Sequence, residues 1–156
     1  MNPKHERWAG PIAPLDSAGL ADRHSVSQLA MVYALGIDMR DLDLVLSAFD
    51  PEGSAIGSVG EMQLGDYLRQ TYAGAEHFRA TQHTMMNQYI DVQGDDATMW
   101  TYGVAHHIAA EDDPDGNLIV GVQYRDTCVR RPGGWIVVRR TARMQWTDGV
   151  LQRSPR

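Results

Sequence analysis

The 156-residue chain is long enough for one domain with its own core, and 43% apolar with 22% charged residues is ordinary globular composition. Its net charge of −6 argues against a nucleic-acid partner, because phosphate-binding surfaces are basic. No apolar run reaches the length of a membrane span, the first residues lack the apolar core of a secretory signal, and the single Cys128 excludes an internal disulfide. We therefore expect a soluble, cytoplasmic protein without a membrane partner.

The first half of the chain is predicted to be helical. Residues 1–16 contain three prolines and no periodicity, which predicts a flexible N-terminal arm. The apolar spacing that follows predicts three helices, over residues 17–37, 40–49 and 61–72. Gly36 is a candidate stop signal for the first helix, and a short strand fits around residues 54–56.

The second half of the chain is predicted to form four long strands, over residues 81–93, 97–110, 118–130 and 135–146. The polar connections between them are short, which indicates antiparallel hairpins. Helices followed by hairpin-linked strands are typical of an α+β fold, here with three helices packed on a curved antiparallel sheet and a pocket between the layers. The domain is expected to span residues 17–148, with a C-terminal tail over residues 149–156.

Three stretches of the sequence resemble the SnoaL-like branch of the nuclear-transport-factor-2-like superfamily. They are Leu20-Ala21-Asp22-Arg23 continuing through Tyr33 to Asp41, then Thr81-Gln82-His83, and finally Gly121–Asp126 with Val129-Arg130, Gly134-Trp135 and Arg139-Arg140. Their order covers residues 18–147. The resemblance implies a cone-shaped α+β barrel with a deep pocket, and dimers or trimers that pack through the outer face of the sheet.

Within that superfamily, an aspartate that ends the first helix and a histidine that opens the next long strand look like the pattern of three elimination enzymes. These are scytalone dehydratase, bile-acid 7α-dehydratase and hexachlorocyclohexane dehydrochlorinase. The resemblance implies that His83 is a catalytic base and that Asp38 orients it. It further implies substrate-binding roles for Tyr33, His107 and Arg143, the last only across a one-residue gap.

The chain also departs from the pattern of scytalone dehydratase. That enzyme has a serine and an asparagine in its third long strand, where this sequence has Val122 and Tyr124. The departure argues against the same substrate.

The residue types of the Asp38–His83 pair suit proton abstraction. The intrinsic pKa of histidine lies near neutrality, and a carboxylate bonded to the second ring nitrogen fixes the tautomer and stabilises the imidazolium. Each residue also has a structural interpretation. In that interpretation, His83 is a surface histidine or a core histidine whose hydrogen bonds are satisfied, and Tyr33 is a core aromatic residue. Asp38 would cap the second helix, although Asp41 would serve as that cap equally well.

His106 and His107 are adjacent, so on a strand they point to opposite faces and only one of them faces the pocket. The resemblance favours His107, although a β-bulge would reverse the assignment. The other face of this strand carries bulkier side chains that suit a subunit interface. Asp126 and Arg140 are interpreted as a structural charge pair on neighbouring strands.

The sequence contains neither a compact metal-ligand motif nor a glycine-rich phosphate loop, so we expect no metal and no cofactor. The first hypothesis is a cofactor-independent lyase or isomerase acting on a small, largely apolar organic molecule. The alternatives are a non-catalytic small-ligand-binding or assembly protein of the same fold, and a structural subunit of a ring-hydroxylating dioxygenase. The distance between His83 and Asp38 discriminates between the enzyme and the binding protein. In the enzyme, a base and its orienting partner lie within hydrogen-bond reach.

Overall fold

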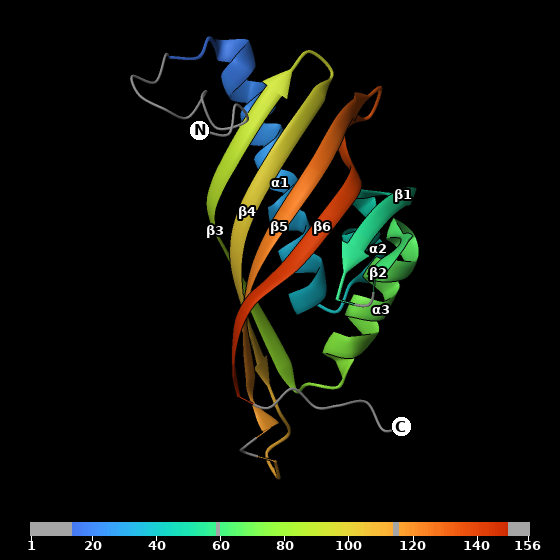
Figure 1. The fold of residues 1–156 in the computed structure, drawn as a ribbon, viewed down its shortest axis with the longest axis vertical. Helices are drawn as coiled ribbons and strands as arrows, with labels where there is room; N and C mark the ends of the chain where they lie inside the picture. Colours follow the sequence, from blue (N-terminus) through green and yellow to red (C-terminus); the bar gives the residue numbers. More distant parts are fainter. Residues whose placement is uncertain (1–13, 59, 114–115, 150–156) are drawn as a thin grey trace.

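The computed structural model describes residues 14–58, 60–113 and 116–149 (Figure 1). Residues 1–13 of the expected arm and 150–156 of the expected tail lie outside the described residues. The elements in chain order are α1 (Ser17–Asp38), α2 (Leu42–Ser47), β1 (Phe49–Gly57), β2 (Gly60–Gln63), α3 (Leu64–Glu76), β3 (Ala80–Gln93), β4 (Asp96–Ile108), β5 (Leu118–Arg131) and β6 (Gly134–Gly149). The α+β class predicted from the sequence is therefore present.

The strands form one six-stranded sheet in the order β2-β1-β6-β5-β4-β3. Strands β3 to β6 pair antiparallel with their chain neighbours, as their short connections predict. However, β1 pairs parallel with β6, so the sheet is mixed and the prediction of an antiparallel sheet was wrong in this respect. Most of the domain lies between these two strands in the sequence, so no tight hairpin constrains their direction.

The region between α2 and α3 also differs from the prediction. The expected second helix is shorter, because Phe49 begins β1. The expected third helix begins at Leu64 rather than residue 61, because β2 pairs with the end of β1. Hydrogen bonds to a neighbouring strand outweigh the local preference of such short segments.

Gly36 does not end α1, which continues to Asp38. A Cβ built at Gly36 would lie 2.6 Å from Cγ2 and 2.8 Å from the backbone nitrogen of Val45 in α2. Such separations are far below ordinary van der Waals contact. The glycine therefore allows the close approach of α2 to α1.

The core lies between α1 and the inner face of the sheet. Figure 1 shows α1 running across one face of β3 to β6, with α2 and α3 gathered beside β1 and β2. The buried face of α1 consists of Val26, Leu29, Ala30, Tyr33, Ala34, Gly36 and Ile37. On β4 every second residue from Ala97 to Ala105 is buried, which confirms the predicted inner face of this strand.

A charge pair is buried within this apolar layer. Asp126 and Arg140 are cross-strand partners on β5 and β6, and both side chains are inaccessible to solvent. The predicted pairing of these residues is confirmed.

None of the helices in the described ranges is long and apolar enough to cross a membrane.

Candidate functional site

Asp38, the last residue of α1, binds the beginning of β3 through both carboxylate oxygens. Oδ1 accepts a hydrogen bond from Thr81 Oγ1 at 2.9 Å and lies 2.7 Å from Nδ1 of His83. Oδ2 accepts the backbone N–H of His83 at 2.7 Å. The carboxylate therefore fixes both the backbone and the ring of His83.

The alternative role of Asp38 as a helix cap is not the one that the structure shows. The cap of α2 is Asp41, whose Oδ1 accepts the backbone N–H of Leu44 at 2.9 Å. Because the first turn of α2 already has a side-chain acceptor, Asp38 is free to bind β3.

The contact with Asp38 determines the tautomer of His83. A carboxylate accepts hydrogen bonds, so Nδ1 of His83 carries the proton and Nε2 has a free lone pair. The side chain of His83 is only 7% exposed, and its ring lines a cavity between the sheet and the helices. Nε2 is therefore the ring nitrogen that is available to a ligand.

The cavity has a volume of about 230 Å³. One part of its wall carries hydroxyl groups and imidazoles, and the remainder is formed mainly by apolar side chains of β5 and β6, including Val120, Val122, Ala142 and Met144. In the part of the chain that the structure describes, no charged side chain lines it. The cavity is therefore suited to a neutral molecule with few polar groups.

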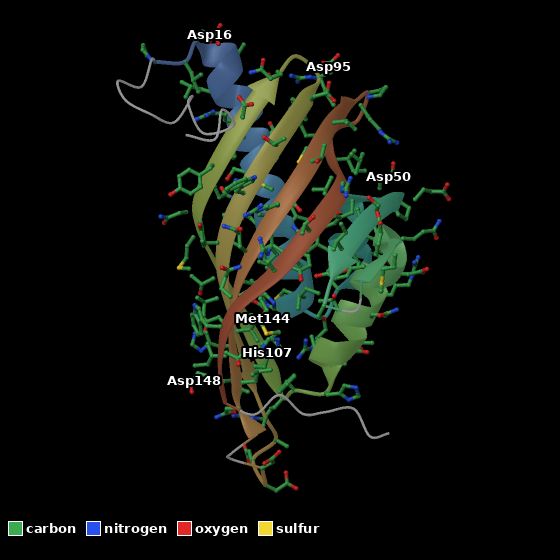
Figure 2. The ribbon with its side chains drawn as sticks, viewed as in Figure 1. Asp16, Asp50, Asp95, His107, Met144 and Asp148 are labelled. Atoms are coloured by element: carbon green, nitrogen blue, oxygen red, sulfur yellow. The ribbon has the colours of Figure 1, made fainter. Side chains whose placement is uncertain are left out.

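His107 lies in this cavity beside His83, with the two ring centroids 5.9 Å apart. Figure 2 shows His107 and Met144 close together in the lower half of the sheet, and both residues line the cavity. Nδ1 of His107 lies 3.3 Å from the carbonyl oxygen of Leu118. Because a carbonyl oxygen only accepts hydrogen bonds, Nδ1 carries the proton and Nε2 of His107 is unprotonated, as in His83. Burial, together with nearby His83, lowers the pKa of His107.

Tyr33 reaches the cavity from the middle of α1 and is 1% exposed. The edge of its ring meets His83, at a centroid distance of 6.0 Å and an interplanar angle of 80°. Tyr67 from α3 and Tyr124 from β5 line the same cavity. Burial raises the pKa of Tyr33 and of Tyr67, and it raises the pKa of Tyr124 to about 12. All three phenols are therefore neutral at physiological pH, and a hydrogen bond joins the side chains of Tyr33 and Tyr124.

Tyr67 and Tyr124 were not among the predicted site residues. Tyr67 has the spacing of an ordinary core residue of an amphipathic helix, so nothing in its pattern distinguishes it. For Tyr124 a signal was present, because the sequence departs at this position from the pattern that the chain resembles.

Arg143 is not brought to the cavity. It lies on β6 between Ala142 and Met144, both of which line the cavity, and its own side chain is exposed. Successive side chains of a strand point to opposite faces, so Arg143 lies on the outer face. No group of three or more histidine, cysteine or acidic side chains in the described ranges has the arrangement to hold a metal ion.

Comparison with known proteins assigns the fold to a family. The sequence profile of the SnoaL-like domain matches residues 18–141, so the chain belongs to the SnoaL-like domain family. This confirms the resemblance found in the sequence. Uncharacterized proteins of Mycobacterium tuberculosis and Mycobacterium bovis are 28% identical to the chain over 132 residues, which is 81% of this chain and 87% of theirs.

Solved structures share the fold at lower sequence identity. A proposed scytalone dehydratase of Novosphingobium aromaticivorans superimposes with a TM-score of 0.77 at 23% identity, covering 90% of this chain and 95% of that one. A protein of Kribbella flavida gives 0.75 at 23% identity, with coverage of 83% and 95%. A hexachlorocyclohexane dehydrochlorinase gives 0.72 at 15% identity, with coverage of 88% and 95%. At these identities the similarity shows the shared fold alone.

Proposed function

We propose that the protein is a cofactor-independent lyase or isomerase that acts on a small, largely apolar molecule. The observation that carries the proposal is the 2.7 Å contact between Asp38 Oδ1 and His83 Nδ1 at the wall of a cavity. Nε2 of His83 takes a proton from a carbon acid, and the carboxylate of Asp38 stabilises the imidazolium that forms. The dehydratase and the dehydrochlorinase among the structural neighbours support an elimination.

The reaction needs a hydrogen-bond donor for the oxygen that gains charge when the proton leaves. Tyr33 is a neutral phenol beside His83 and is hydrogen-bonded to Tyr124, so this pair of phenols suits the role. In an elimination, the electron pair of the broken C–H bond forms a C=C bond and expels the leaving group from the adjacent carbon. In an isomerisation, the same pair accepts a proton back at a different carbon. Either route suits the site, in which His107 supplies a second acceptor for a substrate hydroxyl.

The binding-only alternative requires no contact between His83 and Asp38, so the observed distance favours the enzyme. The apolar wall and the absence of a charged lining residue in the described part of the chain support a neutral substrate. The conical closure of the sheet, the association into dimers or trimers, the domain limits and the cytoplasmic location stay predictions.

Proton abstraction can be tested before the natural substrate is identified. A panel of cyclic ketones in D₂O reports, by NMR, the exchange of the hydrogen next to the carbonyl, whichever reaction follows. His83→Ala is expected to lower the exchange rate by about 10²- to 10⁴-fold, the usual contribution of a general base. Asp38→Asn is expected to cause a large loss as well, because the amide cannot stabilise the imidazolium.

His106→Ala is the matched control, since this histidine lies on the outer face of the strand that carries His107. It is expected to exchange at the wild-type rate. Circular dichroism and thermal melting establish that each variant is folded. Wild-type exchange in both His83→Ala and Asp38→Asn would contradict the mechanism.

A further inference from the structure

A buried ion pair lies beneath the tyrosines of the cavity. Arg140 Nε donates to Asp126 Oδ1 at 2.9 Å, and its Nη2 donates to Asp126 Oδ2 at 2.8 Å. Arg140 is fully buried, and its remaining nitrogen, Nη1, has no hydrogen-bond partner among the described residues. The cation is therefore only partly compensated by hydrogen bonds.

Aromatic rings surround the guanidinium group of Arg140. Its central carbon lies 4.5 Å from the ring centroid of Tyr33, 4.4 Å from that of Tyr124 and 4.6 Å from that of Phe49. Tyr33 and Tyr124 both line the cavity, whereas Phe49 does not. The arginine thus contacts the faces of two rings whose phenol groups belong to the site.

Stability alone is a weak reason to retain this pair. Removing two charges from water is costly, and replacing a buried ion pair with apolar residues of similar volume is often neutral or stabilising. The space around Arg140 is already enclosed by aromatic rings that would pack against an apolar side chain. A role in the neighbouring cavity accounts for a charge at this position.

The charge of Arg140 acts on the phenols directly. It opposes the effect of burial on the pKa of Tyr33, Tyr67 and Tyr124, and in each case its effect exceeds the contrary effect of Asp126. A phenol that ionises more readily is a stronger hydrogen-bond donor. The cation therefore makes these hydroxyls better donors than they would be without it.

We infer that Arg140 and Asp126 are positioning residues that hold the phenols of Tyr33 and Tyr124 toward a ligand oxygen and strengthen their hydrogen bonds to it. The inference rests on the proposed function, because it assigns the pair to the end of the cavity that binds the oxygen. Asp126 fixes the orientation of the guanidinium group, and the guanidinium group fixes the two rings.

The first experiment removes the charge pair while preserving volume, in the double variant Arg140→Met/Asp126→Leu. In ketone exchange, kcat is expected to fall about 10- to 100-fold, by analogy with the loss found when residues that orient metal ligands are removed, while KM changes little. If the pair acts through the phenols, its effect is expected to be much smaller in a Tyr33→Phe/Tyr124→Phe background. Full additivity, or an unchanged kcat, would overturn the inference.

The matched control is Arg130→Met/Asp22→Leu. Arg130 forms an ion pair with Asp22 at 2.7 Å and lies 4.5 Å from the ring of Trp135, and none of the three lines the cavity. This variant is expected to keep the wild-type kcat. If the double variant does not fold, Arg140→Lys is used as the second test of the ion pair. It keeps a cation without the planar two-bond geometry, and a reduced kcat at unchanged KM is again expected.

A second experiment does not depend on His83. 2-Naphthol is titrated into the His83→Ala protein, and its absorbance distinguishes bound naphthol from bound naphtholate. Two proteins are compared, the His83→Ala variant and the same variant with Arg140→Met/Asp126→Leu added. The fraction of bound ligand present as naphtholate is expected to be higher in the first, where the ion pair is intact. Equal fractions, or no saturable binding, would overturn the inference. A higher anion fraction together with unchanged exchange in His83→Ala would instead reject the proposed base and leave the role of the pair supported.

Discussion

At the scale of single residues, the two histidines of the cavity differ in their hydrogen-bond partners. His83 contacts a carboxylate through Nδ1, whereas His107 contacts a backbone carbonyl, and burial together with nearby His83 lowers the pKa of His107. The two rings lie in one cavity and share a tautomer.

His107 predicts a pH dependence of stability. Because its pKa is lower in the folded protein, the folded state binds fewer protons, so this contribution to stability is complete above about pH 6.5 and is lost as the pH falls through the folded-state pKa. Between about pH 7 and about pH 5, the wild type is expected to lose more unfolding free energy than His107→Gln, as measured by urea denaturation. His106→Gln, on the other strand face, is expected to behave like the wild type. An equal loss in His107→Gln and the wild type would refute this account.

At the scale of elements, the site depends on how α1 meets α2 and β3. The close contact at Gly36 brings α2 against α1, and Asp41 caps α2. Asp38 is thereby left at the end of α1 to bind Thr81 and His83. The geometry of the proposed catalytic pair is therefore a consequence of helix packing.

Gly36→Ala tests this packing. The added methyl group collides with Val45, so the substitution is expected to destabilise the protein by about 1–3 kcal/mol in urea denaturation, and to reduce ketone exchange as α2 and Asp38 shift. Gly74→Ala is the control, since Gly74 lies in α3 with open space around its Cα. There the better helix propensity of alanine is expected to add up to about 1 kcal/mol. Similar stability changes for the two variants would argue against the close contact.

At the scale of the whole molecule, the sheet has two unlike faces. The inner face packs on α1 and carries the cavity, whereas the outer face carries large side chains that are partly exposed. Among these, Tyr89 is 38%, Tyr102 37% and Trp146 51% exposed. Tyr89 and Tyr102 are also in edge-to-face contact. Aromatic residues of this kind are enriched in the cores of protein interfaces.

The predicted dimer or trimer is therefore expected to use the outer face of the sheet. Tyr102→Glu is expected to shift the protein toward the monomer in sedimentation-velocity experiments, because a carboxylate is costly to bury in an apolar interface. Leu20→Glu, at a 57% exposed position on α1, is the control and is expected to sediment like the wild type. A monomeric wild type would refute the predicted association.

The identity of most elements was predictable because it depends on local periodicity. The four long strands and the first helix follow from side-chain alternation and helical spacing. The inner face of β4 was assigned correctly, but the family resemblance selected it. The extents of β1 and β2 were not predicted. Both strands are held by hydrogen bonds to other strands, and no local sequence pattern indicates which residues pair. The face of Arg143 was missed because a shift of one residue along a strand reverses the side-chain direction.

The sequence by itself determined the fold class, the order of the long elements and, through family resemblance, the choice of Asp38 and His83. Only the tertiary structure decided that these residues touch, since 45 positions separate them in the chain. It also decided that Asp41 rather than Asp38 caps α2. It decided too that Tyr67 and Tyr124 join Tyr33 in the cavity, where the rings of Tyr33 and Tyr124 lie on Arg140. The physical reason is that periodicity records which side of an element is buried, whereas hydrogen bonds and ring contacts between distant elements depend on how those elements pack.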